Sequence, residues 1–328
     1  MNRKKRKKVL VVYYNLEVGG IEKKLVRLIK SFSKKKLDIE LALFEQKGKL
    51  LKQLPKEVKI YNLKQGGRFR NFFKIIWQLV NIINNQKIEI IFTYGDLPGA
   101  ICLLAKWLSK EKPRVIIGIG NVMSIWIKHT RLSIIRRWMN LFFLPQADKL
   151  IAVSKRIRLD LIENFMVPKR KVMVIYNLKD KLDLVKKRKK TRNKIPVILY
   201  AGRLVKQKRV DLLIKAFAEV SKLIKARLLI IGEGPEKDRL KNLIKKLEMQ
   251  GKIKMENFTL DLNKRLADVD LVVLSSIVEG CPNIIMESMT VGTLVLATKY
   301  PGAEELIKDG QTGFLVDLEV NPKQLANA

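Results

Sequence analysis

Two glutamates lie close to a predicted helix start in the segment Glu279-Gly-Cys-Pro-Asn-Ile-Ile-Met-Glu287. The segment follows residues 271–274, an apolar run that is typical of a buried strand, and Pro282 stands where a helix accepts proline in its first turn. Carboxylates accept hydrogen bonds from sugar hydroxyls, and the free N–H groups of a helix start favour a diphosphate. The segment therefore fits a ligand that joins a sugar to a diphosphate. Alone, two glutamates at this spacing more often belong to a surface loop and an ordinary amphipathic helix.

Alternating strands and helices must position these residues. Residues 9–13 form a continuous apolar, β-branched run, which is typical of a strand buried on both faces of a parallel sheet. Gly19 and Gly20 follow, and apolar residues then recur at helical spacing. The alternation continues, with further strands expected over 39–44, 58–63, 88–94, 114–119 and 149–154, helices over 71–84 and 99–108, and a basic amphipathic segment over 124–144. Such alternation predicts a doubly wound α/β fold.

The second half of the chain repeats this pattern. We expect strands over 197–201, 227–231, 253–258, 271–274, 294–297 and 313–316, and helices over 210–223, 236–249 and 262–267, with another ending near 291. Between the two halves, residues 179–194 are charged and lack an apolar period, so we interpret them as a linker.

The length of 328 residues favours about two domains. We predict two Rossmann-like α/β domains over 1–178 and 195–328, facing each other across a cleft that would hold a ligand at the carboxyl ends of the strands. The sequence stops at Ala328 where a further helix would begin, so we expect that final helix to be missing.

Positive charge is concentrated in the first half. Residues 1–190 hold 45 Lys and Arg against 14 Asp and Glu, a net charge of +31, whereas residues 191–328 hold 22 against 17, a net charge of +5. This asymmetry favours an anionic partner, either a membrane surface with acidic lipids or a nucleic acid. Alternatively, the lysines only solvate exposed faces. Because no nucleic-acid reading module is recognisable, we favour the membrane.

Cys102 and Cys281 lie far apart in apolar surroundings, which argues against a disulfide framework or a zinc ligand set and favours a reducing compartment. The longest apolar stretch, 115–127, falls short of the roughly 18 residues that a membrane-spanning helix needs. We therefore expect a cytoplasmic protein whose contact with the inner face of the cell membrane is peripheral. Basic stretches with aromatic residues over 68–77 and 126–143 suit a membrane interface, although their aromatics could instead be core residues.

Four segments carry a resemblance to a known family: GRLVKQKRVDLLIKAF, LLIIGEGPEKDRL, VDLVVLSSIVEGCPNIIMESMTVGTLVLAT and PGAEELIKDGQTGFLV. In order and spacing they resemble family 4 of the retaining glycosyltransferases, and Glu279 and Glu287 match that family's pair of glutamates. The resemblance implies the two-domain GT-B fold. It also implies transfer of a hexose or N-acetylhexosamine from a UDP- or GDP-sugar to a glycan or lipid-linked acceptor, with anomeric retention, in cell-surface polysaccharide synthesis.

The resemblance also implies roles for particular residues. Arg203 and Lys208 resemble the basic pair that holds the donor diphosphate, where their charge would offset the negative charge that develops on the leaving group. Glu279 would contact the hydroxyls of the donor sugar, and Glu287 the ribose. Residues that would line the sugar, phosphate and nucleoside subsites are Gly280, Cys281, Pro282, Asn283, Gly232, Glu233 and Gly234.

In the N-terminal half, Gly19-Gly20-Ile21-Glu22 matches the family's Gly-Gly-x-Glu loop. Glycine lets a ligand approach the backbone closely, and the helix that follows offers its positive end to phosphate. We therefore expect Gly19 and Gly20 to contact substrate.

The sequence departs from the family in three places. Many members carry His or Arg after the strand that corresponds to 114–119, where this chain has Gly118-Ile-Gly120-Asn121, and we interpret its only histidine, His129, as a surface or structural residue. The segment Pro301-Gly-Ala-Glu-Glu305 has one glycine where the family usually has two, and the final helix is missing. These departures favour an alternative, a catalytically inactive GT-B-like subunit that binds a nucleotide sugar. A nucleic-acid-associated protein is a further alternative that rests on charge alone.

The segment Asp268-Val-Asp270 has the spacing of a metal-binding Asp-x-Asp motif. It falls at a helix-to-strand turn, where aspartate commonly stabilises the turn itself. We therefore predict no metal and no other cofactor, with the nucleotide sugar acting as co-substrate.

Overall fold

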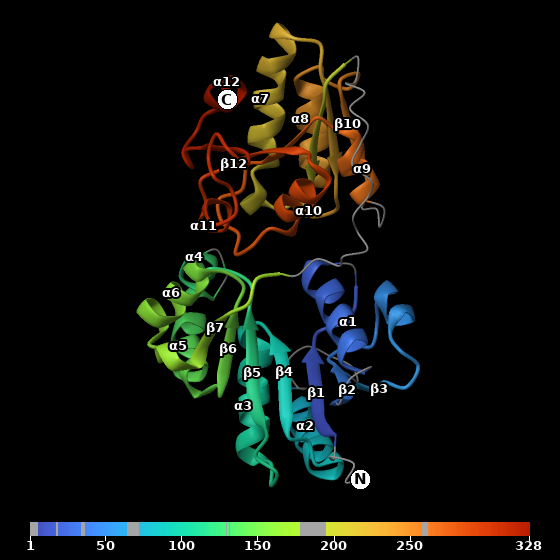
Figure 1. The fold of residues 1–328 in the computed structure, drawn as a ribbon, viewed down its shortest axis with the longest axis vertical. Coiled ribbons are helices and arrows are strands. Elements are labelled where there is room, and N and C mark those ends of the chain that lie inside the picture. Colours follow the sequence, from blue (N-terminus) through green and yellow to red (C-terminus); the bar gives the residue numbers. More distant parts are fainter. Residues whose placement is uncertain are drawn as a thin grey trace. The chain divides into compact units, whose positions relative to one another are not determined.

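The computed structural model describes residues 6–17, 19–33, 37–63, 72–128, 130, 132–177, 195–257 and 262–328. The chain divides into two compact units, Met1–Asn177 and Leu178–Ala328. Each is an α/β layer structure with its own sheet (Figure 1), so the predicted fold of two doubly wound α/β units is confirmed. The predicted linker and His129 lie outside the described residues, and the linker's limits stay a prediction.

The N-terminal unit is built on a seven-stranded parallel sheet with the order β3-β2-β1-β4-β5-β6-β7. Its strands are β1 Lys7–Tyr13, β2 Leu37–Leu43, β3 Lys59–Asn62, β4 Ile90–Tyr94, β5 Arg114–Ile119, β6 Lys149–Ala152 and β7 Val172–Val174. Val11 and Val12 are neighbours in β1, point to opposite faces of the sheet, and are both completely buried. Both faces are therefore covered at this strand, which explains its unbroken apolar run.

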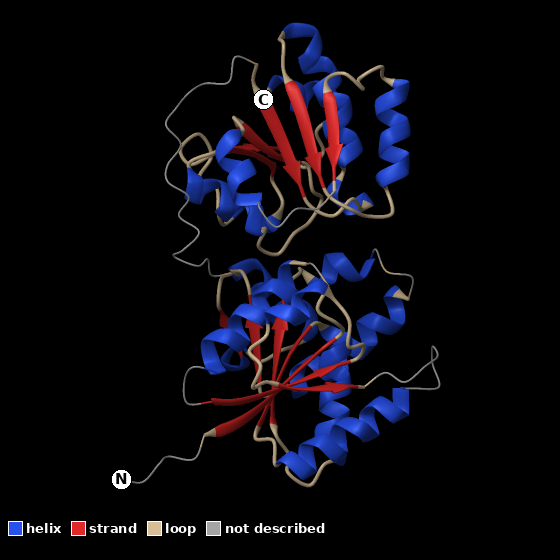
Figure 2. Ribbon diagram, turned by 90° about the vertical axis from the view of Figure 1, so that its right-hand side faces the viewer, coloured by secondary structure: helices blue, strands red, loops and turns tan. Residues whose placement is uncertain are grey.

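Helices lie on both sides of the strands in each unit (Figure 2). In the N-terminal unit they are α1 Gly20–Ser33, α2 Phe72–Gln86, α3 Asp96–Leu108, α4 Met123–Lys128, α5 Ser133–Phe143 and α6 Lys155–Phe165. The amphipathic segment that we predicted over 124–144 is divided into two helices, α4 and α5. Within the described residues, no helix combines the length and the apolar character that crossing a membrane requires.

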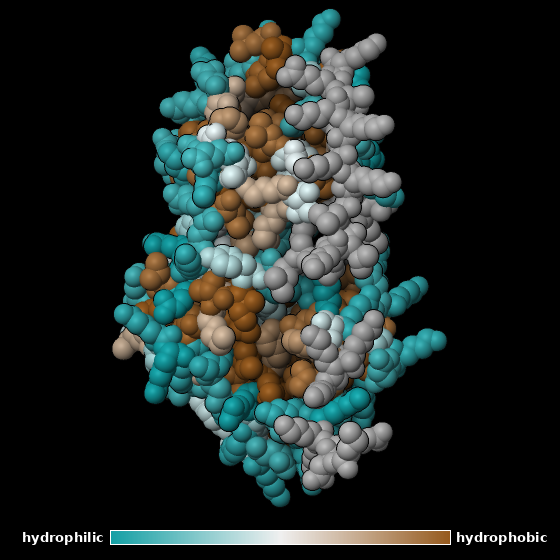
Figure 3. Space-filling view, in the orientation of Figure 1, coloured by the Kyte–Doolittle hydropathy of each residue, from teal (hydrophilic) through white to brown (hydrophobic). Residues whose placement is uncertain are grey.

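Sequence reasoning missed α6 and β7. The start of α6 carries a readable signal, because Ser154 is its N-cap and the Ser154 hydroxyl accepts a hydrogen bond from the Ile157 N–H at 3.2 Å. In the space-filling view of Figure 3, apolar (brown) surface of this unit lies over the strands between α1 and α6.

The C-terminal unit contains a six-stranded parallel sheet with the order β10-β9-β8-β11-β12-β13. Its strands are β8 Val197–Ala201, β9 Arg227–Ile231, β10 Ile253–Glu256, β11 Leu271–Leu274, β12 Leu294–Thr298 and β13 Phe314–Val316. Its helices are α7 Val210–Leu223, α8 Lys237–Lys246, α9 Leu262–Asp268, α10 Asn283–Val291, α11 Pro301–Glu304 and α12 Pro322–Asn327. The helix predicted over 236–249 is shorter at its end, because Glu248 has a positive φ of 58° that terminates helical geometry.

Two hydrophobic clusters hold this sheet between its helices. Leu199 and Tyr200 are neighbours in β8 and both are completely buried. Leu199 belongs to the cluster that includes Ile285 of α10, whereas Tyr200 belongs to the cluster that includes Phe217 of α7. The register of β8 is set by its parallel pairing with β9 and β11, which determines where the loop after it leaves the sheet.

The strand order of the C-terminal unit reverses between β8 and β11. In an open parallel sheet, the loops that leave the carboxyl ends of the two strands at such a point diverge, and ligands bind in the crevice between them. Arg203 and Lys208 follow β8, and Glu279 follows β11. The fold therefore brings the predicted residues to the edge where sites of this fold class form.

Candidate active site

The loops after β8 and β11 are joined by hydrogen bonds. The hydroxyl of Ser275 donates to the carbonyls of Lys208 and Arg209, each at 2.9 Å. In the opposite direction, the Ile277 N–H donates to the Gln207 carbonyl at 2.9 Å. The Gln207 side-chain amide donates to the Val278 carbonyl. The two loops therefore act as one rigid element.

Lys208 and Glu279 form an ion pair across these loops, from Nζ to Oε2. The Lys208 side chain is 15% exposed and the Glu279 side chain 12% exposed, so the pair is largely shielded from water. The other carboxylate oxygen, Oε1, accepts a hydrogen bond from the buried Ser276 hydroxyl at 2.7 Å. Ser276 is itself fixed, because its carbonyl accepts a hydrogen bond from the Thr298 hydroxyl at 2.6 Å. Lys208 and Ser276 thus orient the two carboxylate oxygens of Glu279.

Ser275, Ser276 and Gln207 are residues that sequence reasoning missed. Two serines directly after a buried strand are a usable signal, since side-chain hydroxyls commonly satisfy the backbone where a strand ends. Nothing in the sequence indicates that Gln207 reaches the loop after β11.

Arg203 is exposed, and no described residue shares a hydrogen bond or ion pair with its guanidinium. Its carbonyl accepts a hydrogen bond from the Tyr200 hydroxyl at 3.0 Å. Burial, together with the charge of Glu279, raises the pKa of Tyr200 well above its ordinary value, while the charge of Arg203 lowers it. The charges of Arg203 and Glu279 thus both act on one buried hydroxyl, so both residues lie in its vicinity.

Glu287 lies on the second turn of α10 and is half-buried. No described residue forms a hydrogen bond or ion pair with its carboxylate. Helix α10 begins after Pro282, and no side chain caps its first N–H groups. Uncapped N–H groups at a helix start are suited to an anion.

The glycines of the site allow backbone segments to touch. A Cβ on Gly232 would lie 1.9 Å from the carbonyl oxygen of Gly202, and one on Gly302 would lie 2.6 Å from that of Glu279. Gly234 has a φ of +157°, and a Cβ there would lie 2.3 Å from the Leu204 carbonyl oxygen. The turn after β9 therefore packs on the loop after β8, and the start of α11 packs on the loop that carries Glu279.

The remaining predicted residues of this unit lie in the loop after β11, at the start of α10 and in the turn after β9. Gly280, Cys281 and Pro282 are buried in the loop after β11, and Asn283 begins α10. Glu233 differs from them, because its half-exposed side chain forms an ion pair with Lys237 at 3.0 Å on the outside of the turn. Only the backbone of Glu233 faces the loop after β8, where its carbonyl accepts a hydrogen bond from the Leu204 N–H at 2.8 Å.

Gly19 and Gly20 lie in the N-terminal unit, where α1 begins at Gly20 after β1. This position is the reversal point of that sheet, between β1 and β4. A Cβ on Gly19 would lie 2.1 Å from Oε2 of Glu22.

Many family members carry a larger side chain near the position of Gly118. Packing explains the glycine in this chain. A Cβ at this position would lie 2.3 to 2.7 Å from ring atoms of Tyr94, so the residue must be glycine while that ring stays in place.

Asp270 has a structural role, since its carboxylate accepts a hydrogen bond from the Val197 N–H at 2.9 Å. This contact lies at the amino end of β8, away from Lys208 and Glu279.

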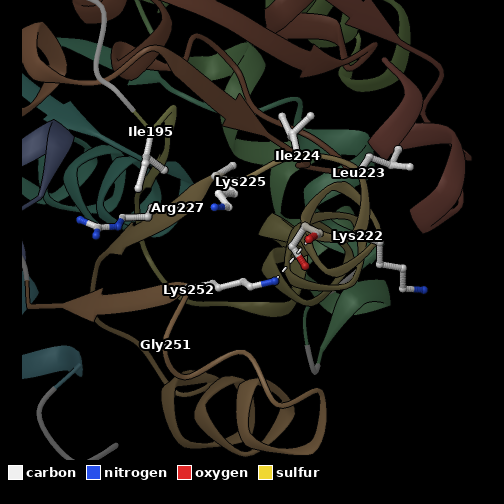
Figure 4. Close-up of a pocket in the computed structure, with 10 residues that line it drawn as sticks. Ile195, Lys222, Leu223, Ile224, Lys225, Arg227, Gly251 and Lys252 are labelled. Atoms are coloured by element: carbon white, nitrogen blue, oxygen red, sulfur yellow. Dashed lines mark hydrogen bonds between the residues drawn. The ribbon is translucent and has the colours of Figure 1, made fainter.

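A separate cavity of about 320 Å³ lies at the amino ends of the strands (Figure 4). It is bordered by Lys225, Arg227 and Lys252, and the Lys252 ammonium donates to the Ser221 carbonyl at 3.3 Å. Because it lies at the opposite edge of the sheet, it takes no part in the candidate site.

Two family models match this chain. The model for Glycosyl transferases group 1 matches residues 183–328, and the model for Glycosyltransferase Family 4 matches residues 18–180. The site residues of the C-terminal unit lie within residues 183–328, the range of the Glycosyl transferases group 1 match.

The sequence is similar to a curated protein of Campylobacter jejuni. This relative is N-acetylgalactosamine-N,N'-diacetylbacillosaminyl-diphospho-undecaprenol 4-alpha-N-acetylgalactosaminyltransferase, which is 29% identical over 95% of this chain and 86% of its own length.

Two solved structures share the fold. HepE from Anabaena, in complex with UDP and glucose, has a TM-score of 0.80 at 21% identity, and covers 98% of this chain and 88% of its own. Sucrose-phosphate synthase from Thermosynechococcus elongatus has a TM-score of 0.83 at 16% identity, with the same shares of 98% and 88%. At these identities the likeness concerns the fold.

Proposed function

Because this chain belongs to the family 4 glycosyltransferases (glycosyl transferases group 1), we propose that it moves a hexose or N-acetylhexosamine from a UDP- or GDP-sugar to a sugar hydroxyl, with anomeric retention. The observation that carries the proposal is the shielded ion pair between Lys208 and Glu279 at the reversal point of the C-terminal sheet. Anionic and cationic groups at one such edge suit a donor that contains both sugar hydroxyls and a diphosphate.

The reaction breaks the bond between the anomeric carbon and the diphosphate oxygen, forms a bond from that carbon to the acceptor hydroxyl oxygen, and releases the proton of that hydroxyl. The leaving diphosphate keeps the electron pair of the broken bond and gains negative charge. Arg203 and Lys208 offset that charge, which lowers the barrier by electrostatic stabilisation. An ammonium has three N–H donors, so Lys208 can hold Glu279 and a phosphate oxygen together.

Glu279 positions the donor sugar in this proposal. Ser276 and Lys208 hold its two oxygens in place, so sugar hydroxyls meet a carboxylate that needs little rearrangement. Glu287 accepts hydrogen bonds from the ribose, and the buried loop of Gly280, Cys281 and Pro282 lines the sugar and phosphate subsite. The reaction as proposed uses no metal ion.

The acceptor that we propose is a sugar on a lipid diphosphate, at the cytoplasmic face of the cell membrane and in the synthesis of a surface glycan. The name of the Campylobacter jejuni relative supports this class of acceptor. The net charge of +31 over residues 1–190 supports an anionic membrane as partner.

A thermal-shift series with UDP, GDP, ADP and their sugar conjugates tests the donor half of the proposal. A nucleotide at 100 times its dissociation constant would add about 2.7 kcal/mol to the free energy of unfolding. We expect UDP or GDP to stabilise the protein, and the matching sugar conjugate to be consumed when a lipid-diphosphate sugar is supplied. Binding without transfer to any such acceptor would instead indicate a nucleotide-sugar-binding subunit, and absence of binding would contradict the site.

A further inference from the structure

Helix α5 carries its apolar side chains on the outside. Ile134 is 73% exposed, Trp138 is 69% exposed and Phe142 is 56% exposed. These residues are spaced four apart, so they form one stripe along the helix. An amphipathic helix at the surface of a globular protein normally turns such a stripe toward the core. Helix α5 does the opposite.

The polar face of α5 is fixed against α3. The Arg136 guanidinium donates two hydrogen bonds to the carboxylate of Asp96, at 2.6 and 2.7 Å, and the side-chain amide of Asn140 donates a third at 3.1 Å. Arg136 also lies over the ring of Trp126, 4.0 Å from its centroid. Rotating α5 to bury its apolar stripe would remove Arg136 from a buried carboxylate, which is strongly unfavourable.

The exposed stripe continues onto the two neighbouring helices. The Trp107 ring of α3 contacts Phe142, with centroids 6.0 Å apart. On the other side of α3, Leu108 borders an apolar groove of about 530 Å³ together with Phe73 and Trp77 of α2. We call this surface the aromatic face; its exposed members are Phe73, Trp77, Trp107, Leu108, Ile134, Ile135, Trp138 and Phe142.

Exposed cations lie close in sequence to members of the aromatic face. They include Lys74 on α2, Lys110 directly after α3, and Arg137 on α5. Arg137 directly precedes Trp138 on α5, and both side chains are exposed. Aromatic and aliphatic side chains beside Lys and Arg are the arrangement found where a helix lies in a membrane interface.

We propose that the aromatic face inserts into the boundary between headgroups and hydrocarbon of a bilayer that contains anionic lipids. A second copy of this chain is a poorer occupant, because two such faces would bring their cations together, whereas anionic headgroups neutralise them. The groove beside Leu108 is lined almost entirely by apolar side chains, so hydrocarbon is the material that suits it. The proposal rests on the membrane partner proposed above and names the surface that contacts it. It can fail independently of sugar transfer, because the donor residues belong to the C-terminal unit.

Sedimentation with lipid vesicles tests the proposal. The full chain is mixed with vesicles of phosphatidylcholine alone, or of phosphatidylcholine with one third phosphatidylglycerol. The test variant is the double substitution Ile134→Ser and Trp138→Ser, and the matched control is Leu223→Ser and Ile224→Ser, which removes two exposed apolar side chains of the C-terminal unit. Thermal shift by UDP and GDP is measured on every variant to report folding and the donor site.

We expect the unaltered chain and the control to bind the anionic vesicles, and the Ile134 and Trp138 variant to bind them at least about tenfold more weakly. Brominated acyl chains should quench tryptophan fluorescence in the unaltered chain and quench it less in the variant. The nucleotide shifts should be equal in all three proteins.

Equal vesicle binding by the variant and the control would overturn the proposal. So would equal binding to neutral and anionic vesicles, or a dimer in light scattering that the Ile134 and Trp138 substitutions dissociate without any vesicle binding. Loss of the nucleotide shift with vesicle binding intact would contradict the proposed function and leave this surface assigned.

Discussion

Lys208 Nζ and Glu279 Oε2 form an ion pair between two loops that are far apart in sequence and joined by hydrogen bonds from Ser275. Because both side chains are largely shielded, each depends on the other for compensation of its charge. The pair is therefore a structural contact and, in the proposed reaction, a part of the donor site.

Glu279→Gln should reduce transfer by about a hundredfold or more, as expected when an oriented charged group is lost from a preorganised site. The amide keeps the shape of the side chain but leaves the shielded Lys208 without its counter-charge, so the free energy of unfolding should also fall, and chemical denaturation must show that the assayed protein is folded. Steady-state kinetics with the identified donor measure the effect. The matched control is Lys206→Ala, which removes an exposed lysine close to Lys208; a similar loss there would contradict a specific role for the pair.

Arg203→Ala should leave stability almost unchanged, within about 0.5 kcal/mol, because its guanidinium has no described hydrogen-bond partner and is exposed. Its effect should appear in kcat, since the leaving diphosphate gains charge in the transition state. Arg203→Lys should restore part of the activity. Full activity of Arg203→Ala would remove this residue from the site.

Glu287→Ala should raise the KM for the donor and weaken binding of the free nucleotide, with little change in thermal stability. The reason is that its half-buried carboxylate has no described partner in the protein to lose. Calorimetric titration with UDP or GDP measures the loss, which we expect to be about tenfold to a hundredfold. Glu319→Ala, at an exposed position of the same unit, should bind the nucleotide normally.

Gly302→Ala should destabilise the C-terminal unit by about 1 to 3 kcal/mol, because its Cβ would lie 2.6 Å from the Glu279 carbonyl oxygen and 2.8 Å from that of Gly280. Chemical denaturation measures the change. Gly251→Ala is the control, since a Cβ there meets nothing within 4 Å. Equal stability of the two variants would show that the loop carrying Glu279 yields easily.

Acid should weaken the attachment of α5. Burial alone would raise the pKa of Asp96, but hydrogen bonds and charge from Arg136, with a hydrogen bond from Asn140, hold it below its ordinary value. Because the pKa of Asp96 is lower in the folded protein than in the unfolded chain, its carboxylate stabilises the fold above about pH 4, the unfolded value. This stability is lost as the pH falls through the lower pKa of the folded state. Asp96→Asn should remove this pH dependence and cost about 3 kcal/mol at neutral pH, since it leaves Arg136 unpaired.

Measuring the free energy of unfolding between pH 3 and pH 7 checks this. An unchanged pH profile in Asp96→Asn would show that another group governs acid stability.

The strands and the location of the site could be predicted because β8 and β11 are buried on both faces, and such strands are apolar without interruption. Arg203 and Lys208 were singled out by the resemblance to the family and not by the strand pattern; in the structure they and Glu279 follow those strands, and the strand order brings them to one edge. The contact of Gln207 with the loop after β11 could not be predicted, because it depends on loop conformation rather than on any periodic pattern.

The sequence left the orientation of α5 open, because its aromatic residues suit a membrane interface but could instead belong to the core. Its sequence shows an apolar face and a polar face, and the usual rule would bury the apolar one. The opposite orientation depends on Asp96, a residue of α3 that no local pattern connects to Arg136.

The contact of Gly232 with the Gly202 carbonyl leaves no room for a side chain at position 232. Peptide groups present the same atoms whatever residues surround them, so the backbone at this contact has little means of telling one base or sugar from another. Exchanging side chains of the loop after β11, such as Ser276 and Cys281, is therefore a more direct route to a changed donor preference than substitution at Gly232.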